Sequence, residues 1–143
     1  MKRRDFIATA ATVAVTSAVP AFAQAPAKAA DMHPPKYKAL EESASSCVAT
    51  GEDCLRHCLA MLSMKDTSMA ACTSSVTELI AVCRALQTLA SVNSTFTPAF
   101  AKNVAAVCDA CGKECQKFSD KYVECKVCAD ACKKCADECR KTA

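Results

Sequence analysis

Thirteen cysteines are spaced along this chain at intervals that place them on single faces of α-helices. Within each cluster the gaps are three, four, seven or eleven residues, so at about 100° per residue the thiols of one cluster share a narrow arc. The C-terminal cluster of five spans roughly 80°, and each other cluster spans roughly 60° or less. The pattern predicts four helices that each carry a stripe of thiols. The cysteines are Cys47, Cys54, Cys58, Cys72, Cys83, Cys108, Cys111, Cys115, Cys125, Cys128, Cys132, Cys135 and Cys139.

Residues that interrupt helices are scarce. After residue 35 the chain contains only Gly51, Gly112 and Pro98 from this class, which predicts an all-α protein. Short connections favour antiparallel neighbours, so we expect an antiparallel up-and-down four-helix bundle over residues 37–143. The predicted helices span residues 37–63, 67–91, 97–118 and about 121–141.

Local signals refine these boundaries. Asp66 or Thr67 is expected to cap the second helix, and Thr97 before Pro98 is a suitable cap and first-turn pair for the third. Gly51 is expected to kink the first helix.

The second half of the chain lacks the usual core residues. After Leu89 there is no leucine, isoleucine, methionine or tryptophan, although an ordinary bundle places leucine at most inward positions. Charged residues such as Lys113, Glu114 and Asp130 flank the thiol stripes. The thiols are therefore expected to face inward and to form a cysteine-lined core.

The first 25 residues have the composition of an export signal. Arg3 and Arg4 precede an apolar segment that ends in an Ala-x-Ala cleavage pattern at Ala21–Ala23. The paired arginines predict a twin-arginine signal, and hence a periplasmic protein exported in the folded state. The alternative, a membrane anchor, is disfavoured because the segment is rich in alanine and threonine. Residues 26–36 are expected to form a flexible arm. Removal of residues 1–25 takes away three basic residues and one acidic residue, so the formal net charge falls from +3 to about +1, which does not indicate nucleic acid or a membrane as a partner of the mature form.

Several functions could require so many thiols. Thirteen is an odd number, and thiols three or four residues apart on one helix have Cβ atoms about 5–6 Å apart, too far for a disulfide. Disulfides between helices remain an alternative, as in an exported, disulfide-braced binding module. A thiol-dependent redox protein is the enzymatic alternative. One or two cysteines could be simple buried apolar residues, but thirteen could not.

An iron–sulfur cluster and zinc are two further alternatives, and each fits the cysteine pattern less well than copper does. The Cys108–Cys115 segment has C-x-x-C-x-x-x-C spacing, but it lacks the proline and the gaps of a bacterial ferredoxin. Zinc bound by four thiolates carries a −2 charge, and no lysine or arginine lies on the stripes to offset it.

Monovalent copper fits the pattern best. Cu(I) is soft, prefers thiolate and thioether ligands, and accepts two-coordinate sites. One Cu(I) per thiolate is electrically neutral, so a core loaded with multiple ions avoids the cost of burying net charge.

Thioether and imidazole ligands, which bind Cu(I) reversibly, follow the first stripe. His57, Met61 and Met64 continue it at helix spacing, and Met69 follows the next turn. We expect these four residues to form an entry site for copper at one end of the bundle. The alternative is that the methionines fill the core and His57 lies on the surface.

The chain resembles the bacterial copper storage proteins, in particular their exported thirteen-cysteine form from methane-oxidising bacteria. The resemblance is carried by the twin-arginine leader, the Cys54–Cys58 pair, the Cys108–Cys115 motif, the Cys125–Cys139 ladder and the His57/methionine group. It implies a homotetramer of four-helix bundles, with all thirteen cysteines as Cu(I) ligands, mostly two per ion. It also implies an entry site at the His57/methionine group and a role in supplying copper for methane oxidation. No catalytic triad or phosphate-binding loop is present in the sequence, so we do not expect an enzyme.

Overall fold

The computed structural model describes residues 32–143, of which His33–Ala143 form one compact unit. The predicted signal, residues 1–25, and most of the predicted arm lie outside the described residues. The elements are α1 (Lys38–Ser63), the short 3₁₀ helix η1 (Thr67–Met69), α2 (Ala70–Ser91), α3 (Thr97–Gln116) and α4 (Val123–Thr142). Residues 32–143 contain no strand, so the all-α prediction is confirmed.

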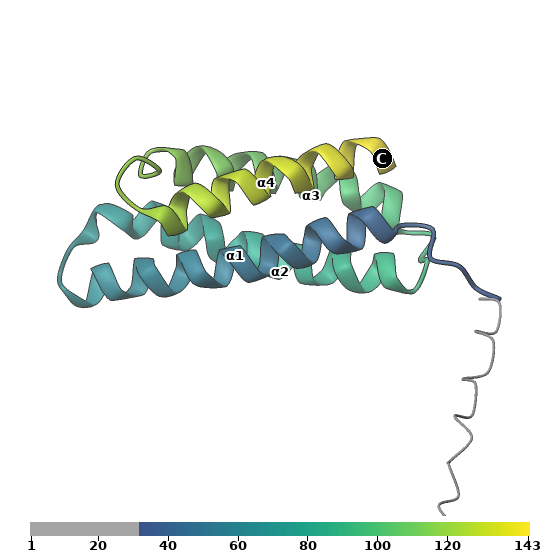
Figure 1. The fold of residues 1–143 in the computed structure, drawn as a ribbon, viewed down its shortest axis with the longest axis horizontal. Helices are drawn as coiled ribbons and strands as arrows, with labels where there is room; N and C mark the ends of the chain where they lie inside the picture. Colours follow the sequence, from purple (N-terminus) through teal and green to yellow (C-terminus); the bar gives the residue numbers. More distant parts are fainter. Residues whose placement is uncertain (1–31) are drawn as a thin grey trace, which may run out of the picture. The chain divides into compact units, whose positions relative to one another are not determined.

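The helices form an up-and-down bundle (Figure 1). Helix α1 packs closely against α2 and α4, and α3 packs closely against the same two helices, whereas the diagonal pairs meet only through side chains in the core. The α1–α2 and α3–α4 connections lie together at one end, which we call the double-turn end (Figure 1). The opposite, single-turn end holds the α2–α3 connection, the start of α1 and the end of α4. The predicted four-helix bundle is therefore confirmed.

The boundary between the last two helices differs from the prediction. Helix α3 ends at Gln116 rather than near residue 118, and α4 begins only at Val123. Between them the chain forms successive turns, in which Phe118 accepts hydrogen bonds from the backbone of both Lys121 and Tyr122. Phe118 and Tyr122 pack against the core from this connection. The longer connection lets both aromatic side chains cover the double-turn end.

One capping prediction is confirmed and another is wrong. Asp66 caps η1, because its carboxylate accepts a hydrogen bond of 2.9 Å from the Ser68 backbone N–H. Thr97 is not the cap of α3 but its first residue, and its side chain is fully buried. The Thr97 hydroxyl instead donates to the carbonyl of Leu89 at 3.1 Å. The carbonyl of Leu89, in the last turn of α2, has no partner within its own helix, and it accepts both this bond and one of 3.0 Å from the backbone N–H of Ser94.

Gly51 has a packing role rather than a helix-breaking one. It is buried inside α1, which continues without interruption from Lys38 to Ser63. A Cβ atom at this position would lie 3.1 Å from Cγ1 of Ile80. Glycine therefore allows α1 and α2 to approach closely.

The start of the bundle is tied to the α2–α3 connection. The backbone N–H of Lys36 donates to the Asn93 side chain at 2.8 Å, and the Asn93 amide donates to the carbonyl of Pro34 at 3.2 Å. Asn93 itself has a φ of 53°, typical of asparagine just after the end of a helix. Residues 34–36, which the sequence assigns to a flexible arm, are therefore held against the single-turn end.

The segment Thr67–Ser91 is long and apolar enough to cross a membrane, with a mean hydropathy of 1.3. In the bundle it carries core residues such as Cys72, Val76 and Leu79 inward. Its apolar character thus reflects its contribution to the core.

Ordinary apolar side chains close the single-turn end. These buried residues come from the start of α1, the end of α2 and the start of α3: Leu40, Ala44, Leu86, Ala90, Ala101 and Val104. Cysteines fill most of the remaining core towards the double-turn end.

Candidate metal centre

Every cysteine of the chain lies in the interior. All thirteen are free and fully buried, so the expected cysteine-lined core is confirmed. Helix α1 contributes three thiols, α2 two, α3 three and α4 five. Because each stripe follows the helical repeat, the four stripes converge on the bundle axis.

The thiols approach one another closely across the helices. The Sγ atoms of Cys72 and Cys115 are 3.7 Å apart, and each lies 3.9 Å from Sγ of Cys54. Cys54 is also 4.0 Å from Cys125, and Cys83 is 4.0 Å from Cys108. These separations are well beyond a disulfide bond of about 2.05 Å. They leave room for an ion between pairs of sulfur atoms.

Larger groups of thiols lie within 4.8 Å of one another. One group takes a single thiol from each helix, and we call it the four-helix thiol layer: Cys47, Cys83, Cys108 and Cys135. The other groups contain three thiols each and share members: Cys54/Cys58/Cys72, Cys54/Cys115/Cys128 and Cys111/Cys128/Cys132. The thiols therefore form a continuous column, with Cys58 and Cys125 towards the double-turn end and Cys139 towards the single-turn end.

Burial and thiol hydrogen bonds divide the cysteines by pKa. Burial raises the pKa of Cys58, and it raises that of Cys125 to about 12. Hydrogen bonds from Cys108 and then Cys132 lower the pKa of Cys47 to about 5. The pKa is raised for nine cysteines: Cys58, Cys72, Cys83, Cys108, Cys115, Cys125, Cys128, Cys132 and Cys139. It is lowered for Cys47, Cys54, Cys111 and Cys135, whose sulfur atoms accept hydrogen bonds from neighbouring thiols. Most of the column is thus protonated when empty, and metal binding must release those protons.

The core holds no fixed charge to balance a bound ion. Among residues 32–143, Thr97 is the sole buried polar or charged residue. A metal–thiolate load with a large net charge would therefore be costly in this interior. Equal numbers of monovalent ions and thiolates avoid that cost.

The structure places His57 between surface and core. Its side chain is 17% exposed, and its ring centroid lies 4.4 Å from that of Tyr122. Nδ1 lies 4.0 Å from a carboxylate oxygen of Glu124, and Nε2 is buried without a hydrogen-bond partner. His57 is therefore partly buried, neither a fully exposed surface residue nor a core residue. A buried imidazole nitrogen without a partner has a lone pair or proton available for a ligand.

The three methionines of the predicted entry site have different environments. Met69 is fully buried, Met61 packs partly buried against the core, and Met64 is 67% exposed. All three lie near the α1–α2 connection, at the double-turn end, as expected from the sequence. Met64 faces outward and does not contribute to the core.

Two neighbours of His57 were not singled out from the sequence. Tyr122 and Glu124 come from the α3–α4 connection and the first turn of α4. Their position just before Cys125, at the start of the last stripe, is the signal that could have identified them.

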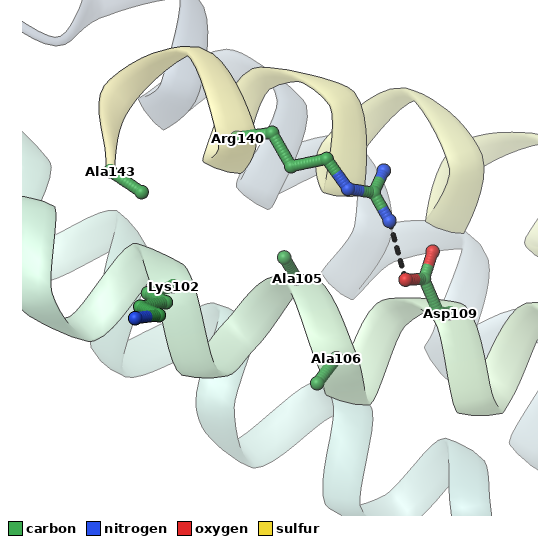
Figure 2. A pocket seen from close by; sticks show the side chains of 6 residues that line it. All are labelled: Lys102, Ala105, Ala106, Asp109, Arg140 and Ala143. Carbon is green, nitrogen blue, oxygen red and sulfur yellow. Dashed lines mark hydrogen bonds and ion pairs between the residues drawn. The ribbon is translucent and has the colours of Figure 1, made fainter.

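The surface cavities lie outside the thiol column, although one of about 190 Å³ between α3 and α4 reaches Cys108. A cavity of about 510 Å³ lies between α3 and α4, and its sides are formed by Lys102, Ala105, Ala106, Asp109, Arg140 and Ala143. Figure 2 shows Arg140 reaching from α4 across this cavity to form an ion pair with Asp109 of α3. Its lining includes no cysteine. The candidate metal centre is therefore the bundle interior and not a surface cleft.

Comparisons with known proteins agree with this geometry. A family model described as copper storage protein matches residues 33–143. The Cu(I)-bound copper storage protein BsCsp3 is 28% identical, with a TM-score of 0.67 over 74% of this chain and 96% of that one. Copper-free copper storage protein 3 from Bacillus subtilis is 27% identical, with a TM-score of 0.65 over 74% of this chain and 97% of that one.

A third structure is the copper storage protein Ccsp from Streptomyces lividans, loaded with 10 copper equivalents. It is 26% identical, with a TM-score of 0.67 over 80% of this chain and 90% of that one. A search of curated proteins finds no match. Because the family model spans the whole bundle, the chain belongs to the copper storage protein family.

Proposed function

We propose that this protein stores Cu(I), holding many ions as thiolates inside a closed helical bundle. The single observation that carries the proposal is the column of thirteen buried thiols in a core without fixed charge. Soft Cu(I) matches thiolate ligands, and one ion per thiolate leaves the interior neutral. Family membership supports the same role. The protein is a reservoir, not a catalyst.

All thirteen cysteines serve as ligands in this proposal, most ions being held by two thiolates. Copper enters at the double-turn end, where His57, Met61, Met64 and Met69 gather. Two observations support this direction. Apolar residues close the single-turn end, and Nε2 of His57 lacks a hydrogen-bond partner. Thioethers and neutral imidazole can pass an ion to the thiols because neither needs to lose a proton first.

The cellular setting is part of the proposal and rests on the sequence. Residues 1–25 act as a twin-arginine signal, residues 26–36 as an arm and residues 37–143 as the copper-binding domain. Folded export to the periplasm keeps the thiols buried in an oxidising compartment. Assembly as a homotetramer and supply of copper for methane oxidation follow from the resemblance described above.

The decisive experiment is an anaerobic Cu(I) titration of the reduced mature protein against a chromogenic chelator. We expect saturation near one copper per cysteine, roughly thirteen per chain, because each thiolate neutralises one ion. Saturation at one or two ions would overturn the storage function and indicate a carrier site near His57.

A thiol titration without reductant tests the disulfide alternative. Near thirteen free thiols in freshly purified protein are expected for a store. Near one free thiol would instead favour an exported, disulfide-braced binding module.

A further inference from the structure

We propose that the copper-free protein has a tetrahedral site for one divalent ion of the zinc type, formed by the four-helix thiol layer: Cys47, Cys83, Cys108 and Cys135. The site holds the four helices together until copper arrives. This inference goes beyond Cu(I) storage, and its test does not depend on the copper capacity.

The layer has the ligand number and arrangement that zinc requires. Each of its four thiols comes from a different helix, and all four Sγ atoms lie within 4.8 Å of one another. A Zn–S bond of about 2.3 Å in tetrahedral geometry places the sulfur atoms about 3.8 Å apart. The Cys83–Cys108 pair is already at 4.0 Å. Small side-chain adjustments therefore complete the site without moving a helix.

The rest of the column is less suited to a divalent ion. Its other groups hold three thiols each and share Cys54 or Cys128. Cys54 also lies 3.9–4.0 Å from three thiols, Cys72, Cys115 and Cys125, but it is the shared member of two of these groups. They cannot all supply four separate thiolates at once. Two-coordinate and three-coordinate positions suit Cu(I), whereas zinc in structural sites is nearly always four-coordinate. One divalent ion per chain is the expected limit.

The surroundings are those of a closed structural site. All four cysteines are fully buried, and the layer lies next to the apolar residues that close the single-turn end, including Leu86 and Val104. Zinc sites with four protein ligands and no open position serve structure rather than catalysis. An ion bound here would link all four helices at one level.

The net charge of the zinc complex allows copper to replace the bound ion. Binding converts four thiols and one Zn²⁺ into a tetrathiolate complex of charge −2, with release of four protons. The core has no fixed cation to offset that charge, because Thr97 is the sole buried polar or charged residue among residues 32–143. Four Cu(I) ions on the same thiolates form a neutral load and release the Zn²⁺. Copper therefore displaces the divalent ion, which is consistent with the argument against a column of stored zinc.

Anaerobic titration of reduced, copper-free protein with Co(II) tests the proposal. Cobalt in a tetrahedral thiolate site gives intense visible absorption bands and a sulfur-to-metal charge-transfer band, which distinguish it from octahedral Co(II). We expect saturation at roughly one ion per chain. The bands should be lost in Cys83→Ser and in Cys135→Ser. They should persist in Cys58→Ser, the matched control from a three-thiol group.

Two further measurements keep the test independent of the folding of the variants. X-ray absorption of the wild-type zinc complex should show four sulfur neighbours near 2.3 Å. Zinc should raise the melting temperature of the wild type and of Cys58→Ser, but not that of Cys83→Ser. Titration with Cu(I) should then abolish the cobalt bands.

Three results would overturn the site: no tetrahedral spectrum at equimolar cobalt, saturation at several ions, or bands unchanged in both layer variants. None of these would affect the Cu(I) capacity. Failure of the divalent site is thus separable from failure of the storage function.

Discussion

Replacing Gly112 by alanine is expected to stabilise the copper-free protein by about 0.5–1 kcal/mol, because glycine in a helix interior is less favourable than alanine by that amount. Gly112 lies buried in α3 where this helix approaches α4. An added Cβ would lie 3.4 Å from Cβ of Cys132 and 3.9 Å from the carbonyl oxygen of Ala129, which are ordinary contacts. The methyl group therefore gains helix propensity without displacing its neighbours.

Gly51→Ala is the matched comparison, because it gains the same propensity at a tighter position. Its Cβ would lie 3.1 Å from Cγ1 of Ile80 and 3.5 Å from Cγ2 of Val76. Excess packing of this kind typically costs about 1–3 kcal/mol, which outweighs the propensity gain. We expect Gly112→Ala to be more stable than Gly51→Ala by about 1 kcal/mol or more.

Guanidinium unfolding of both reduced, copper-free variants under anaerobic conditions, followed by far-UV circular dichroism, measures the difference. Copper capacity should remain that of the wild type, since neither substitution changes a thiol. Either of two results would contradict the helix separations at Gly51 and Gly112: a Gly112→Ala variant less stable than the wild type, or a Gly51→Ala variant at least as stable as Gly112→Ala.

Three further predictions concern single positions. Lys65 has a φ of 64°, so Lys65→Gly should raise stability by about 1 kcal/mol and increase the melting temperature. Thr97→Val should lower stability by about 0.5–1 kcal/mol in a denaturant titration, because the carbonyl of Leu89 loses its bond from the hydroxyl and keeps only that from the Ser94 backbone N–H, whereas Thr97→Ser keeps both. Burial raises the pKa of Cys125 from 9.0 to about 12, so the unfolded chain loses this proton at a lower pH than the folded protein. The difference in unfolding free energy between the copper-free wild type and Cys125→Ala should therefore keep its full value below pH 9.0 and fall as the pH rises towards 12. No change in this difference over that range would contradict the burial argument.

The sequence was most informative where the structure depends on local periodicity. Helix content and the inward direction of every thiol follow from spacings of three and four residues, and all were predicted. The same spacing placed His57 and Met61 next to the first stripe, at the correct end of the bundle. These properties depend on the rotation of one residue relative to the next along the same helix.

The errors arose where distant segments meet. Thr97 looked like a helix cap, but its hydroxyl bonds instead to the carbonyl of Leu89 on the preceding helix. Gly51 was expected to kink the first helix, whereas its role is one of packing, because a Cβ there would lie 3.1 Å from Cγ1 of Ile80 on the neighbouring helix. The end of α3 was placed too late because Phe118 packs on the core from a turn. Each case depends on a neighbour that local spacing does not identify.

The sequence by itself determined the class of the protein: four helices, each with a stripe of thiols facing a core whose second half has no leucine, isoleucine, methionine or tryptophan. Only the tertiary structure decided which thiols meet. The helical repeat sets the direction of a side chain around its own axis, but the relative height and rotation of two helices depend on the packing between them. Close approaches at Gly51 and Gly112 and the lengths of the three connections set those heights. They bring Cys47, Cys83 and Cys108 level with Cys135 and leave the other groups with three thiols each.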